Sequence, residues 1–150
     1  MELDATQVRK IILDEHCVLR DELQEIGTLL DDVAVQRADA TARLRLRLMA
    51  FYSAFLKHIA HEESLLRPVL RDIDAWGPVR VERMDEEHRQ QRATIVALAA
   101  LDPAVDLDAY LGRVKAFVRE VERDMADEER ECLSPEVLRD DTIVIDTFTG

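Results

Sequence analysis

The sequence is poor in the residues that build small cross-linked or sheet-rich proteins. Its 150 residues include two cysteines, four glycines and four prolines, and aromatic residues make up 5%. Two cysteines, Cys17 and Cys132, are too few for a disulfide scaffold. Because 47% of the residues are hydrophobic and 35% are charged, this composition favours long helices with charged outer faces. The length suits one domain with a substantial core.

Two further absences concern location and partners. No stretch approaches the roughly 20 apolar residues of a membrane span, and the opening Met1-Glu2-Leu3-Asp4 lacks the basic and apolar regions of a signal peptide. We therefore expect a cytoplasmic protein with no membrane partner. The formal net charge of −12 argues against a nucleic-acid partner, because phosphate backbones are bound by clustered lysine and arginine.

Apolar periodicity and helix breakers predict four long helices. The expected helices run from Asp4 or Thr6 to about Asp32, from Asp39 to Pro68 or a few residues beyond, from Pro78 to about Leu101, and from Asp106 to Ser134. We expect Asp4 or Thr6 to cap the first helix, Asp39 the second and Asp106 the fourth, and a kink or an end at Pro68. The fold class is therefore all-α, an up-down-up-down four-helix bundle over residues 1–135. A short irregular tail over residues 136–150 is expected to lie across the bundle or to pair with a second subunit as a homodimer.

The buried face of the second expected helix contains polar residues. Its apolar positions, four and three residues apart, are Leu44, Leu48, Phe51, Phe55, Leu65 and Val69. Continued through the gap, the same face includes His58 and Glu62. An imidazole and a carboxylate one turn apart in a core need a compensating partner, and one metal ion can bind both.

The other three helices place polar residues in the same way. His16 occurs where the first helix should bury an aliphatic residue, and His88 does so on the third helix, whose face is interrupted by Gln91. Asp124 and Glu128 take consecutive buried positions on the fourth helix. Counted from the loops, all of these groups lie at similar heights in the bundle. We expect six metal-ligating side chains in one layer, namely His16, His58, Glu62, His88, Asp124 and Glu128.

The two halves of the chain also resemble each other. Residues 58–63, HIAHEE, align with residues 124–129, DMADEE, and residues 14–16, DEH, align with residues 86–88, EEH. Such two-fold pseudo-symmetry suits two metal ions, each held mainly by one half, with Glu62 and Glu128 as bridges. Alone, a buried histidine is more often a hydrogen-bonded core residue. The combined set is more specific, because no lysine or arginine shares the buried faces.

Three imidazoles and three carboxylates form a mixed nitrogen and oxygen site. Iron or manganese suits this set, zinc is an alternative, and calcium is disfavoured because imidazole binds it poorly. The ferritin-like carboxylate proteins form another four-helix metal class, but they need Glu-x-x-His on two helices. Here only residues 85–88, DEEH, come close.

In order and spacing, the pattern over residues 5–135 resembles the hemerythrin-like (HHE cation-binding) family. The shared features are a His on the first helix, His-x-x-x-Glu-Glu on the second, a His on the third and x-x-x-Glu-Glu on the fourth. The resemblance implies a non-haem di-iron centre, with His16, His58, Glu62, His88 and Glu128 at family ligand positions. The sequence departs from the family pattern at two places. A position that holds histidine in the family is Asp124 here, and the residues one turn from His88 are Met84 and Arg92, neither of which is a histidine.

A carboxylate-rich site of this kind disfavours reversible O₂ carriage, since it stabilises ferric iron. We expect a protein that reacts with or senses O₂, peroxide or NO. The alternatives are iron storage or delivery, and a metal-dependent sensor without turnover, so the sequence leaves enzymatic activity open. His61 is expected at the surface or beside the ligands. Hydrogen-bond partners of the histidines are expected among Glu63, Glu87, Asp127 and Glu129.

Overall fold

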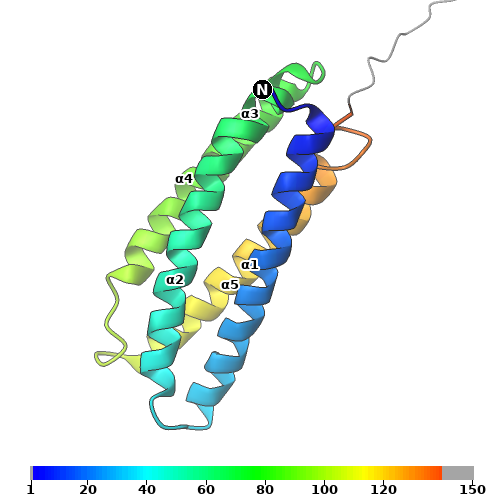
Figure 1. Cartoon of the computed structure of the whole chain (residues 1–150). Helices are drawn as coiled ribbons and strands as arrows, with labels where there is room; N and C mark the ends of the chain where they lie inside the picture. Colours follow the sequence, from blue (N-terminus) through cyan, green and yellow to red (C-terminus); the bar gives the residue numbers. More distant parts are fainter. Residues whose placement is uncertain (1, 140–150) are drawn as a thin grey trace, which may run out of the picture.

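A computed structural model of the chain describes residues 2–139 as a bundle of four antiparallel rods (Figure 1). The elements are α1 (Ala5–Ala34), α2 (Ala40–His61), the π-helix η1 (Glu62–Leu66), α3 (Arg67–Asp72), α4 (Gly77–Ala99) and α5 (Leu107–Glu131). The second rod consists of α2, η1 and α3 without a break. The predicted all-α, up-down-up-down architecture is confirmed, and the described part of the chain contains no strand. None of its helices is both long and apolar enough to span a bilayer.

Helix caps agree with the sequence at two of three aspartates. Asp4 accepts a hydrogen bond from the backbone N–H of Gln7 at 2.8 Å, and Asp106 accepts one from Ala109 at 3.0 Å. The prediction for Asp39 was wrong in detail. Asp39 precedes α2, but it has a φ of 59° and its side chain makes no capping hydrogen bond. Its backbone is used to reverse the chain direction between α1 and α2.

The second rod passes through Pro68 and ends at Asp72. Proline has no N–H to give to the carbonyl four residues earlier, and its ring crowds that carbonyl. The wider turn of η1 precedes it, with the N–H of Arg67 donating to the carbonyl of Glu62 five residues back. The π-turn allows the helix to continue where a break or sharp kink was expected.

This π-turn changes which residues face the core. The sequence predicted Leu65 and Val69 as the continuation of the buried face, but Leu66 and Leu70 are the fully buried residues. The reason is that a π-turn adds one residue to the turn, and therefore rotates the following helix by about 100°. A related correction applies to α5, where Met125 is buried and Asp124 lies half-buried at the edge of the face.

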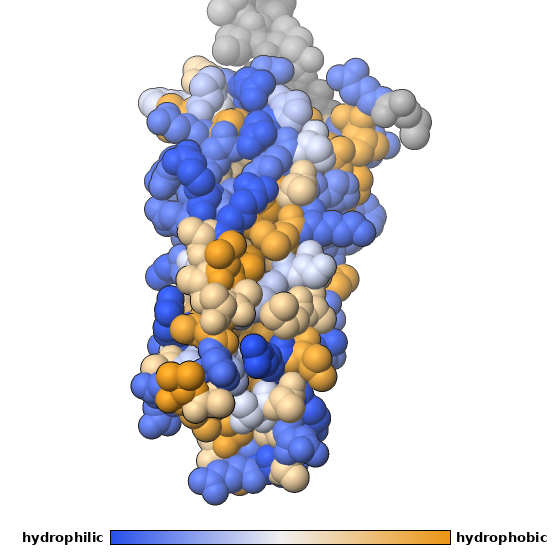
Figure 2. Space-filling view, turned by 90° about the vertical axis from the view of Figure 1, so that its left-hand side faces the viewer, coloured by the Kyte–Doolittle hydropathy of each residue, from blue (hydrophilic) through white to orange (hydrophobic). Residues whose placement is uncertain are grey.

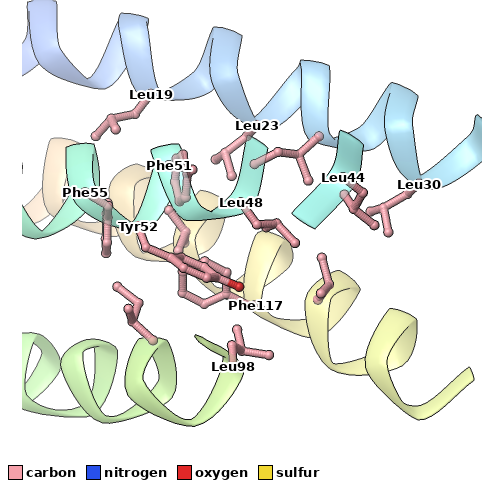
Figure 3. Packing of buried hydrophobic residues seen from close by; sticks show 14 of the residues in the cluster. Leu19, Leu23, Leu30, Leu44, Leu48, Phe51, Tyr52, Phe55, Leu98 and Phe117 are labelled. Carbon is pink, nitrogen blue, oxygen red and sulfur yellow. The ribbon is translucent and has the colours of Figure 1, made fainter. Parts of the chain in front are cut away.

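The apolar core consists of two clusters with the polar layer between them. The lower cluster packs all four rods around Phe51 and Phe117 (Figure 3), whose rings meet edge to face at 6.1 Å between centroids. The upper cluster includes Ile12 and Leu66. On each rod, at least one polar residue of the layer lies between a member of one cluster and a member of the other. His16, for example, falls between Ile12 and Leu19.

The outer surface combines charged and apolar areas. Figure 2 shows the side formed by α2 and α4, with mostly hydrophilic side chains over its upper end and hydrophobic side chains, interspersed with hydrophilic ones, lower down. Exposed apolar residues on these helices include Leu46, Met49 and Val96. After α5, Leu133 and Leu138 are buried in the upper cluster. The proposed contacts of the tail at residues 142–148 fall outside the described residues.

Candidate metal centre

The carboxylate of Glu62, the first residue of η1, lies at the centre of the polar layer. Its Oε1 is 2.6 Å from Nε2 of His58 and 3.4 Å from Nε2 of His16. Its Oε2 is 2.8 Å from Nε2 of His88. All four side chains are buried. The two oxygens of this carboxylate thus face imidazoles on different helices. Oε1 faces those on α1 and α2, and Oε2 faces the one on α4.

Glu128 adds a carboxylate from α5. Its Oε1 lies 3.3 Å from Nε2 of His16, and its side chain is 10% exposed. This oxygen is buried and has no hydrogen-bond partner in the described residues. One ligand atom from each of His16, His58, Glu62 and Glu128 lies within 4.8 Å of the other three. An unsatisfied buried carboxylate oxygen beside inward-facing imidazole nitrogens fits a bound cation, which would satisfy all of them.

The outer nitrogens of the three imidazoles face a second set of carboxylates. Nδ1 of His58 is 2.8 Å from Glu15, and Nδ1 of His88 is 3.1 Å from Glu63. Nδ1 of His16 is 3.8 Å from Glu129, which is an ion-pair distance beyond hydrogen-bonding reach. An outer carboxylate that accepts the Nδ1 proton leaves the lone pair on Nε2, pointing inward, where a metal ion would bind it.

The outer carboxylates are in turn held by positive groups. Arg20 binds Glu129 through both guanidinium nitrogens, one at 2.8 Å. Arg92 binds Glu63 in the same bidentate way, at 2.6 and 2.9 Å. Each arginine lies one turn after a histidine of the centre, Arg20 after His16 and Arg92 after His88. These two sets of histidine, glutamate and arginine are therefore related by the sequence repeat.

A third set of outer contacts lies on the side of the centre formed by α2. Glu15 accepts from Nδ1 of His58 with one oxygen and lies 2.5 Å from Nδ1 of His61 with the other. The His61 side chain is 43% exposed, which agrees with its expected position at the surface. Glu15 thus fixes two imidazoles of α2 from the neighbouring helix.

The fourth side of the centre is acidic. Asp124 accepts a hydrogen bond from the side-chain amide of Gln91 at 3.0 Å, and it is close enough to Glu87 for its charge to raise the pKa of Glu87. Glu87, Gln91 and Asp124 line a cavity of about 10 Å³ together with the other centre residues. That volume is close to the smallest that holds one water molecule, so the centre has room for ions and very small molecules only.

The two central carboxyl groups have opposite pKa shifts. Burial alone would raise the pKa of Glu62, but hydrogen bonds with the three histidines hold it well below 4.5. Burial and the neighbouring Glu62 carboxylate raise the pKa of Glu128 well above 4.5. Two such groups side by side cannot both ionise unless a proton or a metal cation lies between them.

The pKa values of His58 and Glu87 are also raised, so both groups hold a proton near neutral pH. Burial lowers the pKa of His58, yet hydrogen bonds to Glu15 and Glu62 outweigh it and raise the pKa to about 9. Burial, and then the charge of Asp124, raise the pKa of Glu87 to about 8. Without metal, protons therefore balance the buried charges of the centre. A metal ion would displace them, because ligands bind metals in their deprotonated forms.

A family model described as the hemerythrin HHE cation-binding domain matches residues 7–134. The chain belongs to this family. Comparison with the curated proteins and with the solved structures found no match. The family resemblance seen in the sequence is therefore confirmed over most of the chain. A cation-binding role also agrees with the histidine and glutamate cluster of this hemerythrin-like protein.

All six residues that the sequence predicted as ligands line the one small cavity of the hemerythrin-like centre. They are His16, His58, Glu62, His88, Asp124 and Glu128. Four of them form the compact cluster, whereas His88 and Asp124 lie outside it. His88 faces the second oxygen of Glu62, and Asp124 is engaged by Gln91. The ligand role of each residue stays a prediction.

Sequence reasoning missed several partners in this hemerythrin-like site. It named Glu63, Glu87, Asp127 and Glu129 as histidine partners. Glu63 and Glu129 lie beside histidine Nδ1 atoms, whereas Glu87 interacts with Asp124 and Asp127 pairs with Arg130. It gave Glu15 no role at the site and treated Gln91 as a break in an apolar face. The available signal was position, since Glu15 precedes His16 and aligns with Glu87 in the repeat, while Gln91 occupies a buried place on α4.

Proposed function

We propose that this hemerythrin-like protein holds a non-haem di-iron centre that reacts with or senses O₂, peroxide or NO. The observation that carries the proposal is the position of Glu62. Its Oε1 faces His16 and His58, and its Oε2 faces His88. A carboxylate with its oxygens divided in this way is suited to bridge two ions, one held mainly by each half of the chain.

The two ends of the centre would hold different ligand sets. His16 and His58 give one end two imidazoles, with Glu62 and Glu128 beside them. At the other end His88 is the only imidazole, and Asp124 is the nearby carboxylate on α5. Nitrogen and oxygen donors without a thiolate suit iron, with manganese or zinc as alternatives. The excess of carboxylates favours ferric iron, and therefore oxidation or sensing over reversible O₂ carriage.

In this proposal the residues around the centre have distinct tasks. Iron, when bound, supplies the electrons and the binding position for a diatomic or peroxide ligand. Glu15 and Glu63 hold the Nδ1 protons of His58 and His88, which keeps both rings turned toward the centre. The apolar clusters above and below exclude bulk water from the layer. The small cavity excludes substrates larger than a few atoms.

The test is elemental analysis of protein purified from the cytoplasm of an expression host without added metal, with absorption spectra before and after exposure to air. We expect two irons per chain and a spectrum that changes with oxygen, peroxide or NO. Two zinc or manganese ions per chain would contradict the proposed redox chemistry of iron, but would leave the bridging role of Glu62 intact. Loading well above two per chain would favour storage, and a response without turnover would favour a sensor.

A further inference from the structure

The repeat relates Glu15 to Glu87, and their surroundings are electrostatically opposite. Glu15 lies between two imidazoles, His58 at 2.8 Å and His61 at 2.5 Å. The residues that align with those histidines are Asp124 and Asp127, and both add negative charge around Glu87. One half of the chain thus surrounds its glutamate with bases, and the other half surrounds it with acids.

Three sides of the centre are closed by ion pairs. Arg20 binds Glu129 outside His16, Arg92 binds Glu63 outside His88, and His61 binds Glu15 outside His58. The side between α4 and α5 differs. Within residues 2–139, neither Glu87 nor Glu128 forms an ion pair with a lysine or an arginine. A cation that reaches this side would meet Glu87, a carboxyl group without a lysine or arginine partner in the described residues.

On this side, an outer cavity and the centre share lining residues. A cavity of about 410 Å³ between α4 and α5 is lined by Glu87 and Glu128, the same two residues that line the small inner cavity. A second cavity of about 510 Å³ adjoins it and shares Glu87 and Asp127. Carboxylates outnumber guanidinium groups six to three along these walls. Two of those arginines are already paired, Arg80 with Asp74 and Arg130 with Asp127. Of the carboxylates, Asp127 is thus paired too, and Glu86 pairs with Arg89.

Glu128 provides an independent sign of a cation at the inner end. Its Oε1 is buried without a hydrogen-bond partner in the described chain, and its side chain is nine-tenths buried. Glu128 lines both the inner and the outer cavity, which places this residue between them.

We propose that divalent metal ions enter the centre between α4 and α5, and that Glu87 is a transfer ligand that binds the ion in the outer cavity and passes it to Glu128 and Glu62. The transfer is an exchange of carboxylate ligands, without oxidation. This inference rests on the proposed metal centre and adds to it the direction of loading. It also gives a role to a carboxylate outside the family pattern.

The experiment measures how fast metal-free protein takes up Co²⁺ or anaerobic Fe²⁺ in a stopped-flow instrument, and separately how much metal it finally holds. Glu87→Gln should slow uptake about tenfold, the lower end of the effect of losing a group beside a metal centre, because an amide binds the passing ion less well than a carboxylate, while the final content equals that of the wild type. The matched control is Asp21→Asn, which removes an exposed carboxylate from α1 and should leave both quantities unchanged.

A charge reversal tests the outer part of the path. Asp127→Lys should slow uptake at low salt, and the effect should shrink as salt screens the surface charges. Asp21→Lys makes the same change of net charge on α1 and should have little effect. A third variant, Ala54→Leu, narrows the apolar cavity of about 670 Å³ between α1 and α2, which also reaches His58, and uptake should stay fast.

The outcomes separate the path from the centre. Fast uptake in both Glu87→Gln and Asp127→Lys, or slow uptake in Ala54→Leu alone, would overturn the α4–α5 path. An unchanged rate with a lower final content in Glu87→Gln would make Glu87 a permanent ligand and overturn its transfer role. A wild type that binds no metal at all would overturn the proposed function itself, and the entry path with it.

Discussion

Gln91 donates its side-chain amide to Oδ2 of Asp124 at 3.0 Å. Both residues line the inner cavity, and Gln91 is buried. The equivalent of Gln91 in the other half of the chain is Leu19, a member of the lower apolar cluster. This hydrogen bond therefore exists in only one half of the repeat, at the position where the family pattern has histidine.

The first prediction concerns that position. Asp124→His should give stronger iron retention or altered reactivity with O₂, because imidazole restores the family ligand. Adding Gln91→Leu to this variant should increase the effect, since no amide then competes for the new side chain. Metal content after dialysis against a chelator, with absorption spectra, measures both. Glu122→His, on an exposed part of α5, is the control. If Asp124→Ala retains all of its metal, Asp124 is not a ligand.

The second prediction addresses the shared carboxylates. Glu62→Ala and Glu128→Ala should each weaken metal binding by more than about 100-fold, beyond the loss typical of outer partners. Both variants should still form the bundle, because Ile59, Met125 and their neighbours pack independently of the polar layer. Equilibrium titration measures the affinity, and helix content by circular dichroism verifies the fold. Full metal content in both variants would exclude the bridging arrangement.

The third prediction tests how Glu15 positions histidines. Glu15→Gln should lower metal affinity by about 10- to 100-fold, because the amide no longer holds the Nδ1 protons of His58 and His61 as a carboxylate does. Asp14→Asn removes the neighbouring exposed carboxylate, which pairs with Lys10, and should leave the affinity unchanged. The histidine Nδ1 resonances in NMR spectra should shift in Glu15→Gln alone. Equal affinities in the two variants would show that Glu15 has no positioning role.

The fourth prediction is a pH dependence of the metal-free protein. The pKa of His58 is raised from 6.5 to about 9, so its contribution to stability is complete below pH 6.5 and is lost as the pH rises through 9. The pKa of Glu87 is raised to about 8, and forcing it to ionise in the fold destabilises in the same direction. We expect the unfolding temperature of chelated protein to fall by about 5 °C or more from pH 6.5 to 9.

Thermal unfolding in the presence of a chelator measures this fall. Glu87→Gln should reduce the slope, since the amide does not titrate. The unfolding temperature of metal-loaded protein should instead rise with pH, because deprotonation of the ligands strengthens metal binding. Equal unfolding temperatures of the chelated wild type at both pH values would contradict the electrostatic account.

Much of the bundle followed from the sequence because its signals are local. Capping by Asp4 and Asp106, and the apolar period of α1, depend on neighbours within a turn or two. The π-turn was not predictable in the same way. The pairs Leu65-Leu66 and Val69-Leu70 offer an apolar residue in either register, so periodicity alone does not separate an α-turn from a π-turn.

The inner residues of the centre were predictable because polar side chains stood out on apolar faces. Their partners were not, because Glu15 resembles any solvated acid on a helix until α2 is placed beside it. Asp124 was assigned to the buried face by a period of four and three, whereas the structure buries Met125. From Val121, the buried face continues four residues on, at Met125, and not three residues on, at Asp124. The helix sequence alone permits both steps.

The polar layer divides the interior, and this has a consequence for cooperativity. Above it the smaller cluster around Leu66 and Leu133 joins the ends of the rods, and below it the larger cluster joins their lengths. Without metal, the layer is held by protons and hydrogen bonds, so we expect the upper end of the bundle to open separately. Amide hydrogen exchange should then be faster in α3 than in the lower half of α1. With metal bound to residues of all four rods, the two ends should exchange as a single cooperative unit, and the ion would set the size of that unit.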